Sequence, residues 1–223
     1  NPLIIENIFN SEINFLKKSK IQIESVTCDF FMQKPFFKKK YFKDKKKITN
    51  YLNMLIKHSE ILGIKYIVIP LVDNSSIKSK NEEKIVINYF SKIQSRLKKL
   101  NILFESDYKP IRLHNFIKKF DKEFFGINYD TGNSAALGYD IKEEYRYFKY
   151  VKNIHIKDRK LKSSSVGLGD GDVNFKTFFK YLKKSKYKGN LILQTARVKS
   201  NQHLNEIKKN IKFVQKLLWK KKY

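Results

Sequence analysis

Three ionisable side chains follow short strand-like runs at equal intervals along the chain. Glu105 follows Ile-Leu-Phe, Asp130 follows Ile-Asn-Tyr, and His155 lies between two isoleucines. Each interval is 25 residues. A fourth polar side chain, Gln194, ends the run Leu-Ile-Leu 39 residues after His155. Because parallel strands present their carboxyl ends at one edge of a sheet or barrel, we expect these four side chains to meet in space.

The four side chains form a donor set that suits a divalent metal ion. Two carboxylates, an imidazole and an amide oxygen are hard or borderline ligands, which Mn²⁺, Mg²⁺, Co²⁺ and Zn²⁺ accept. Such an ion can polarise a carbonyl and a neighbouring hydroxyl of a sugar, which makes the carbon-bound proton between them easier to remove. A lone histidine on an apolar strand is more often a packed core residue, but the two carboxylates at matching strand ends favour the ligand interpretation of His155.

The rest of the chain predicts the elements that position these groups. Apolar patterns indicate strands over 21–29, 66–71, 102–105, 126–130, 153–157 and 190–194. Helical patterns cover 5–18, 45–62, 82–100, 110–120, 142–151, 175–184 and 204–219, while 131–139 and 158–172 are expected to be loops. Six strands, each followed by a helix, predict an α/β fold with a parallel sheet.

The pattern favours a TIM-type barrel over a doubly wound sheet. A doubly wound sheet usually has a glycine-rich phosphate turn after its first strand, and none is present here. Polar side chains at several strand ends are typical of a barrel, whose strand ends converge on one mouth. A complete barrel has eight strand–helix units, and the sequence indicates six after an initial helix. We therefore expect residues 1–223 to form one barrel domain that lacks about two N-terminal units.

The net charge does not by itself indicate a nucleic-acid partner. The formal charge is +27, from 48 lysines and arginines against 21 aspartates and glutamates. Only five of the 48 are arginine, the residue that nucleic-acid surfaces favour for its paired hydrogen bonds: Arg96, Arg112, Arg146, Arg159 and Arg197. Lysines occur in almost every predicted helix, so a solvated lysine coat is the better interpretation. We expect weak, salt-dependent binding to polyanions and no specific nucleic-acid partner.

The cysteine content and the hydropathy of the chain indicate its cellular compartment. The single cysteine, Cys28, excludes an internal disulfide and fits a reducing compartment, so a cytoplasmic protein is expected. Cys28 lies in an apolar pattern and is predicted to be a buried thiol. No apolar run is long enough to span a membrane, and the N-terminal residues do not resemble a signal peptide.

Five motifs, in this order and spacing, resemble the xylose-isomerase-like barrel superfamily of sugar and sugar phosphate isomerases and epimerases. They are Phe-Glu-Ser-Asp at 104–107, Tyr-Asp-Thr-Gly-Asn at 129–133, Ile-His-Ile-Lys-Asp at 154–158, Gly-Leu-Gly-Asp-Gly-Asp-Val-Asn-Phe at 167–175 and Tyr-Lys-Gly at 187–189. The resemblance runs from the third barrel strand to the last helix. It implies a divalent metal held by Glu105, Asp130 and His155, and a sugar or sugar phosphate as substrate.

Two positions depart from the pattern of the epimerases in this superfamily. Those enzymes usually carry a second glutamate, both ligand and base, where this chain has Gln194. An amide can offer an oxygen to a metal but cannot accept a proton at neutral pH, so Glu105 is the expected base, with Lys157 and Asp158 as alternatives. Asn133, predicted to bind the substrate, replaces a frequent histidine. A ketose–aldose isomerase or a dehydratase-like lyase therefore stays open.

Arginines and glycines near the strand ends suggest how an anionic substrate is held. Arg159 and Arg197 follow two strand ends in a chain that hardly uses arginine, which is consistent with a clamp on a phosphate or carboxylate. Ion pairs with Asp158 or Asp170 are an equal alternative. The glycines at 167–171 could present N–H groups to an anion, although glycines more often only shape a turn. Asp158 is also expected at the substrate site.

Three functional hypotheses follow. The first is a metal-dependent isomerase or epimerase for a sugar or sugar phosphate. The second is a DNA-repair endonuclease of the same superfamily, but that group holds several zinc ions with additional histidines, whereas Val72-Asp73 offers none and Asn133 occupies a ligand position. The third is a catalytically impaired barrel or binding module, because a glutamate is replaced by Gln194 and two units are expected to be missing. Oligomer formation stays open.

Overall fold

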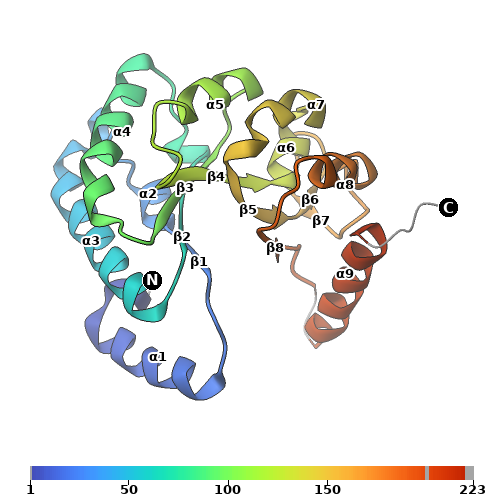
Figure 1. Ribbon diagram of the computed structural model, residues 1–223, viewed down its shortest axis with the longest axis horizontal. Helices are drawn as coiled ribbons and strands as arrows, with labels where there is room; N and C mark the ends of the chain where they lie inside the picture. The colour runs from blue at the N-terminus through green and yellow to red at the C-terminus, as the bar shows by residue number, and fades with distance from the viewer. Residues whose placement is uncertain (1, 199–200, 219–223) are drawn as a thin grey trace. The chain divides into compact units, whose positions relative to one another are not determined.

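Figure 1 shows the computed structural model, which describes residues 2–198 and 201–218. The helices are α1 (Glu6–Ser19), α2 (Asp29–Gln33), α3 (Lys45–Leu62), α4 (Lys80–Ile93), α5 (Pro110–Ile117), α6 (Thr131–Leu137), α7 (Ile141–Glu144), α8 (Phe175–Lys184) and α9 (His203–Leu218). Short 3-10 helices are η1 (Pro2–Ile4), η2 (Lys39–Asp44), η3 (Asp73–Ser75), η4 (Gln94–Arg96) and η5 (Tyr145–Tyr150). Among these described helices, none has the length and apolar character needed to cross a membrane.

The strands are β1 (Ser25–Thr27), β2 (Tyr66–Leu71), β3 (Asn101–Ser106), β4 (Phe125–Asp130), β5 (Val151–Ile156), β6 (Asp158–Arg159), β7 (Ser165–Val166) and β8 (Asn190–Leu193). Six of them form one sheet in the order β1-β2-β3-β4-β5-β8. The pairs β1–β2, β2–β3, β3–β4 and β5–β8 are parallel. The predicted α/β class with a parallel sheet of six strands is confirmed.

The chain divides into two compact units, Asn1–Ser106 with Phe116–Ile127, and Asp107–Asn115 with Asn128–Tyr223. In the first unit, β2 is buried on both faces, as its continuous apolar run predicts, and Ile67, Val68 and Ile69 are fully covered. Phe104 of β3 contacts the rings of four other phenylalanines, Phe90, Phe116, Phe120 and Phe125. This close packing of β3 fixes the position of the strand end that carries Glu105.

In the second unit, α8 covers the strands with one apolar face. Phe175, Phe178, Phe179 and Leu182 of α8 are buried, which confirms them as helix core. The ring of Phe178 stacks on that of Tyr129 in β4, with centroids 5.7 Å apart. Phe175 in turn meets Phe213 of α9 edge-on at 5.2 Å. These contacts hold the end of β4, where Asp130 lies, against α8, which itself packs against α9.

Two segments expected to be loops contain regular structure. The segment 131–139 contains the helix α6 (Thr131–Leu137), because the Asp130 side chain accepts the Asn133 N–H and caps the helix, and Gly138 (φ +71°) ends it. Residues 158–172 contain the antiparallel pair β6–β7, with Asp158 opposite Val166. Both short elements depend on contacts that local apolar periodicity does not reveal.

Other boundaries differ from the predictions. The predicted helix 142–151 is only one turn of α-helix, α7, followed by η5. In η5 the rings of Tyr145 and Phe148 contact each other in a tilted arrangement, with centroids 5.7 Å apart, as three-residue spacing in a 3-10 helix allows. The predicted strand 21–29 is shortened to β1, because Ile21 is 60% exposed and Asp29 already begins α2. Helix α4 ends at Ile93, before the predicted limit. Trp219, the expected end of the last helix, lies outside the described residues.

Cys28 is buried, as predicted. Its thiol is completely covered between β1 and α2, and this burial, with the nearby Asp29 charge, raises its pKa well above the ordinary value. The thiol therefore stays protonated at neutral pH, which is expected of a structural cysteine.

Candidate metal centre

Asp130 ends β4 with its two carboxylate oxygens in different environments. Oδ1 accepts the Asn133 N–H at 2.8 Å, which caps α6. Oδ2 is buried and has no hydrogen-bond partner among the described residues, and the Lys157 Nζ lies 3.9 Å from it. Burial raises the pKa of Asp130, an effect that the Lys157 charge opposes. A buried carboxylate oxygen left without a hydrogen bond is unfavourable unless a cation binds it, so the donor set fits a metal ion.

His155 is held on β5 with its ring almost covered. His155 is 5% exposed, and its Nδ1 lies 3.2 Å from the Asn128 Nδ2. Asn128 in turn accepts a hydrogen bond from Asn153 at 2.7 Å. Burial, with the Lys157 charge, lowers the pKa of His155 to about 4. The imidazole is therefore neutral at neutral pH, the form that can bind a metal.

Glu105 completes the set that the sequence spacing predicted. It is half-buried near the end of β3, in register with Pro70 of β2. Glu105, Asp130 and His155 each offer one ligand atom, and these atoms lie within 4.8 Å of one another. Ligands at about 2.1–2.5 Å from one ion lie within roughly 5 Å of each other, so the spacing suits a single ion. Their role as ligands stays a prediction.

Gln194 and Arg197 follow β8, and both side chains are exposed. The register of β8 places Ile192 beside His155 and Leu193 beside Ile156. The Gln194 N–H donates to the Ile156 carbonyl at 3.0 Å, which extends the pairing by one residue. The predicted roles of Gln194 as a ligand and of Arg197 as a substrate clamp stay predictions.

The Thr131 side chain links the end of β4 to the segment that follows β5 by hydrogen bonds. Its hydroxyl donates to the Lys157 carbonyl at 2.6 Å and accepts the Lys157 N–H at 2.9 Å. This reciprocal pair fixes the backbone between the residues that follow Asp130 and His155. Thr131 was not predicted as a site residue, because 131–139 was expected to be a loop. A hydroxyl directly after a strand-end carboxylate is the signal that was available.

Two residues predicted to bind the substrate contact each other. The Arg159 Nη1 donates to the Asn133 Oδ1 at 2.8 Å, and Nε and Nη2 donate to the Ser163 carbonyl at 2.9 and 2.7 Å. These hydrogen bonds, instead of an ion pair with Asp158 or Asp170, orient the guanidinium. Asn133 and Arg159 are both half-buried, so the pair is accessible from outside.

Asp158, also predicted at the substrate site, has a clear structural role. Its carboxylate is completely buried and accepts four backbone N–H groups, from Arg159, Gly169, Gly171 and Val173, at 2.9–3.2 Å. A Cβ on Gly171 would lie 2.2 Å from the Asp158 Oδ1, so this glycine is required for close approach. The N–H groups of the glycine-rich segment thus surround an anion that belongs to the protein itself. Its predicted contact with substrate stays untested.

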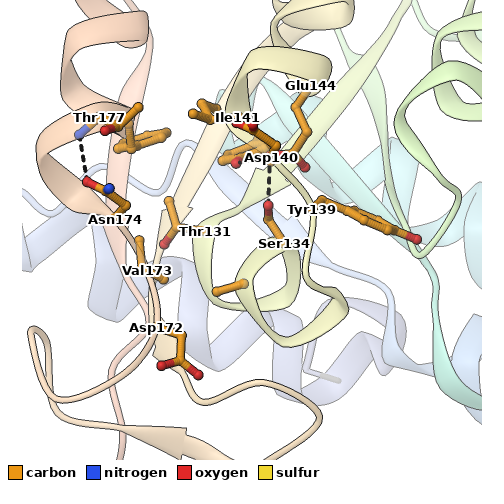
Figure 2. Close-up of a pocket in the computed structure, with 13 residues that line it drawn as sticks. Thr131, Ser134, Tyr139, Asp140, Ile141, Glu144, Asp172, Val173, Asn174 and Thr177 are labelled. Carbon is orange, nitrogen blue, oxygen red and sulfur yellow. Dashed lines mark hydrogen bonds between the residues drawn. The ribbon is translucent and has the colours of Figure 1, made fainter.

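A separate cavity of about 250 Å³ lies among α6, α7 and α8 (Figure 2). At its wall is Glu144, whose carboxylate accepts hydrogen bonds from the hydroxyls of Tyr129, Ser134 and Tyr147 at 2.7–2.8 Å. Burial raises the pKa of Glu144 above its ordinary value, although the three hydroxyls oppose this shift. No local pattern in the sequence indicates this network, because its members come from four separate elements.

The chain belongs to the xylose isomerase-like TIM barrel family. The family pattern described as "Xylose isomerase-like TIM barrel" matches residues 16–217, which is most of the sequence. The family resemblance seen in the strand-end motifs is thereby confirmed. No curated protein matches the sequence.

Solved structures of low sequence identity have the same fold. A D-tagatose 3-epimerase-like protein superposes with a TM-score of 0.75 at 16% identity, covering 95% of this chain and 82% of its own. The IOLI protein with a bound zinc atom has a TM-score of 0.71 at 15% identity, covering 89% and 76%. A xylose isomerase-like TIM barrel protein from Mycobacterium smegmatis in complex with magnesium has a TM-score of 0.68 at 16% identity, covering 91% and 75%.

Replacement of Asp158 by asparagine is expected to loosen the glycine-rich segment. The amide would turn an NH₂ group toward backbone donors that now share a carboxylate, and roughly 2–5 kcal/mol of unfolding free energy should be lost. Urea unfolding measures the loss, and amide hydrogen exchange at Gly169 and Gly171 locates it. Asp170→Asn, at an exposed neighbouring position, is the control. Unchanged exchange at both glycines would contradict the role given to Asp158.

Replacement of Glu144 by glutamine is expected to change how stability depends on pH. Because the folded protein raises the Glu144 pKa, it binds more protons than the unfolded chain from about pH 4 up to the raised pKa. Wild-type stability should therefore fall with rising pH across that window relative to Glu144→Gln, which does not titrate. Unfolding free energies at a series of pH values test this, with exposed Glu143→Gln as control. Parallel curves would show that Glu144 has no shifted pKa.

Proposed function

We propose that this chain is a divalent-metal-dependent isomerase or epimerase that acts on a sugar or sugar phosphate. The observation that carries the proposal is the Asp130 Oδ2, a buried carboxylate oxygen without a hydrogen-bond partner among the described residues. It accompanies His155, which is neutral at neutral pH. A buried anionic oxygen and a neutral imidazole complement a cation better than they complement each other.

Family membership supports the same chemistry. Structures with this fold include a D-tagatose 3-epimerase-like protein, a protein with bound zinc and a protein in complex with magnesium. The donor set of two carboxylates and one imidazole accepts either metal, as well as Mn²⁺ or Co²⁺. We therefore propose a divalent ion held by Glu105, Asp130 and His155, with the Gln194 amide oxygen as a further ligand.

Under this proposal, the chain's own residues divide the proton transfer between them. A divalent ion, when bound, polarises a sugar carbonyl and the adjacent hydroxyl, which acidifies the carbon-bound hydrogen between them. Glu105 accepts that proton, because Gln194 cannot. Lys157, whose Nζ lies 3.9 Å from the Asp130 Oδ2, can donate a proton to a substrate oxygen over the same strand end.

The substrate is oriented by the Asn133–Arg159 pair. The guanidinium is already fixed by the Ser163 carbonyl, so little conformational entropy is lost when it binds a hydroxyl or phosphate. Arg197 supplies a second cationic side chain after β8 for a phosphorylated sugar. The N–H groups of the glycine-rich segment are engaged by Asp158, so recognition of an anionic group would fall to the arginines.

Metal binding is expected to depend on Asp130 and His155. Asp130→Asn keeps an oxygen that can cap α6 but removes the negative charge, and His155→Ala removes the imidazole. Each variant should bind Mn²⁺ at least about tenfold more weakly than wild type in calorimetric titration. Exposed His203→Ala is the matched control and should bind as wild type does. Equal affinity of all four proteins would exclude this site.

The proton transfer is expected to be visible as hydrogen exchange. With Mn²⁺ and a panel of ketoses and their phosphates in deuterium oxide, a substrate should incorporate deuterium at the carbon next to its carbonyl and form an isomer. Glu105→Gln retains a potential oxygen ligand but should reduce the exchange about a hundredfold or more. Metal binding without exchange in any sugar would indicate a binding module. Cleavage of abasic DNA would instead indicate the endonuclease activity.

A further inference from the structure

Gly132 occupies a buried position in the first turn of α6, where alanine would favour the helix more. Its φ is not positive, so this position does not need the left-handed backbone that glycine allows. A Cβ built on Gly132 would lie 2.8 Å from the Lys157 Cγ, and 3.1 Å from the Lys157 Cβ and the Arg159 Cγ. Non-bonded carbon atoms prefer separations of about 3.5–4.0 Å. The glycine therefore leaves room for two side chains of the segment that follows β5.

The two side chains that pass Gly132 are held in place and cannot simply move aside. The Thr131 hydroxyl makes two hydrogen bonds with the Lys157 backbone, at 2.6 and 2.9 Å, which fix the start of the Lys157 side chain. The Arg159 guanidinium donates to Asn133 and to the Ser163 carbonyl. A methyl group on Gly132 would therefore force the Lys157 stem to rotate. Because staggered wells lie roughly 120° apart, the stem would take a different direction.

The direction of the Lys157 stem decides where its ammonium group lies. The Lys157 Nζ is 3.9 Å from the Asp130 Oδ2, and the Lys157 side chain is 19% exposed. The Asp130 Oδ2 is buried and has no hydrogen-bond partner among the described residues. A divalent ion that binds to this oxygen meets the ammonium as a like charge, and two positive charges at such short range repel each other. Lys157 in this position therefore weakens the attraction of Asp130 for cations.

We propose that Thr131 and Gly132 are positioning residues that hold the Lys157 ammonium beside Asp130, where it lowers the affinity of the site for a divalent ion. Thr131 fixes the backbone of Lys157, and Gly132 leaves the space through which the Lys157 stem reaches the end of β4. An ion that binds must overcome this ammonium or displace it. The effect on metal affinity rests on the proposed function, whereas the position of Lys157 does not.

Mn²⁺ titrations of a double-mutant cycle test the part played by the Lys157 charge. Lys157→Met keeps an unbranched stem and removes the charge, so it should bind Mn²⁺ about tenfold more tightly than wild type. Gly132→Ala should bind at least about threefold more tightly, because the methyl group turns the stem away from Asp130. In the Lys157→Met background, Gly132→Ala should leave the affinity unchanged, because no charge remains to be moved. Exposed Lys160→Met is the matched control for a lost charge and should bind nearly as wild type does.

The position of Lys157 is measured without metal. Brief acetylation with acetic anhydride, followed by proteolysis and mass spectrometry, gives the labelling rate of each lysine. Lys157 is largely covered in wild type, so it should react more slowly than exposed Lys160. In Gly132→Ala the displaced stem loses this cover, and the rate at Lys157 relative to Lys160 should rise severalfold. An unchanged ratio would overturn the proposal, because the stem would have kept its place despite the methyl group.

The outcomes separate this proposal from the proposed function. If wild type binds no Mn²⁺, the proposed function fails and the effect on affinity fails with it, while the labelling ratio still decides whether Gly132 positions Lys157. If Gly132→Ala changes Mn²⁺ affinity equally with and without the Lys157 charge, the substitution acts on Asp130 itself and the inference is overturned.

Thermal unfolding shows whether each variant is folded. If Gly132→Ala does not fold, Thr131→Val takes its place, because valine keeps the shape of the side chain but removes the hydroxyl that fixes the Lys157 backbone. The labelling ratio of Lys157 to Lys160 should then rise in Thr131→Val, and an unchanged ratio there would overturn the inference.

Discussion

The organisation of the site depends on how the carboxylate of Asp130 is shared between structure and chemistry. One oxygen caps α6 by accepting the Asn133 N–H, while the other is buried without a hydrogen bond among the described residues. The cap fixes the direction of the side chain, so the second oxygen cannot turn to solvent to satisfy itself. Thr131, the next residue, binds the backbone of Lys157 through its hydroxyl. One short segment therefore sets both the carboxylate and the strand end beside it.

The pKa shifts of Asp130 and His155 bear on how the site would bind a divalent cation. Burial raises the pKa of Asp130 and lowers that of His155, so each group is pushed toward its neutral form. Lys157 opposes the first shift and reinforces the second. A divalent cation would favour ionised Asp130 and needs neutral His155, and it can also replace Lys157 as the counter-charge of the carboxylate. A bound divalent cation would thus match the charges of Asp130 and His155 that binding requires.

The sequence predicted those parts of the fold that local periodicity encodes. The limits of β2 and α8 were correct because a continuous apolar run and a three-to-four residue pattern mark them directly. The equal spacing of Glu105, Asp130 and His155 predicted their approach because each interval is one strand–helix unit. The helix α6 was missed, since its start depends on a side-chain cap. The Asp158 network was missed because its glycine donors come from the distant end of a segment with no periodicity.

The position of Gln194 limits which chemistry the proposed site can perform. A base on the last strand, facing a base on β3, would allow a proton to be taken from one face of a substrate carbon and returned to the other. Under the proposed function, the Gln194 amide could not act as that second base, so with Glu105 as the base the proton would more readily return to the same face, on a neighbouring carbon. That is aldose–ketose isomerisation, and inversion would require Lys157 to supply the second proton. Under the proposed function, Gln194 therefore favours isomerisation over epimerisation.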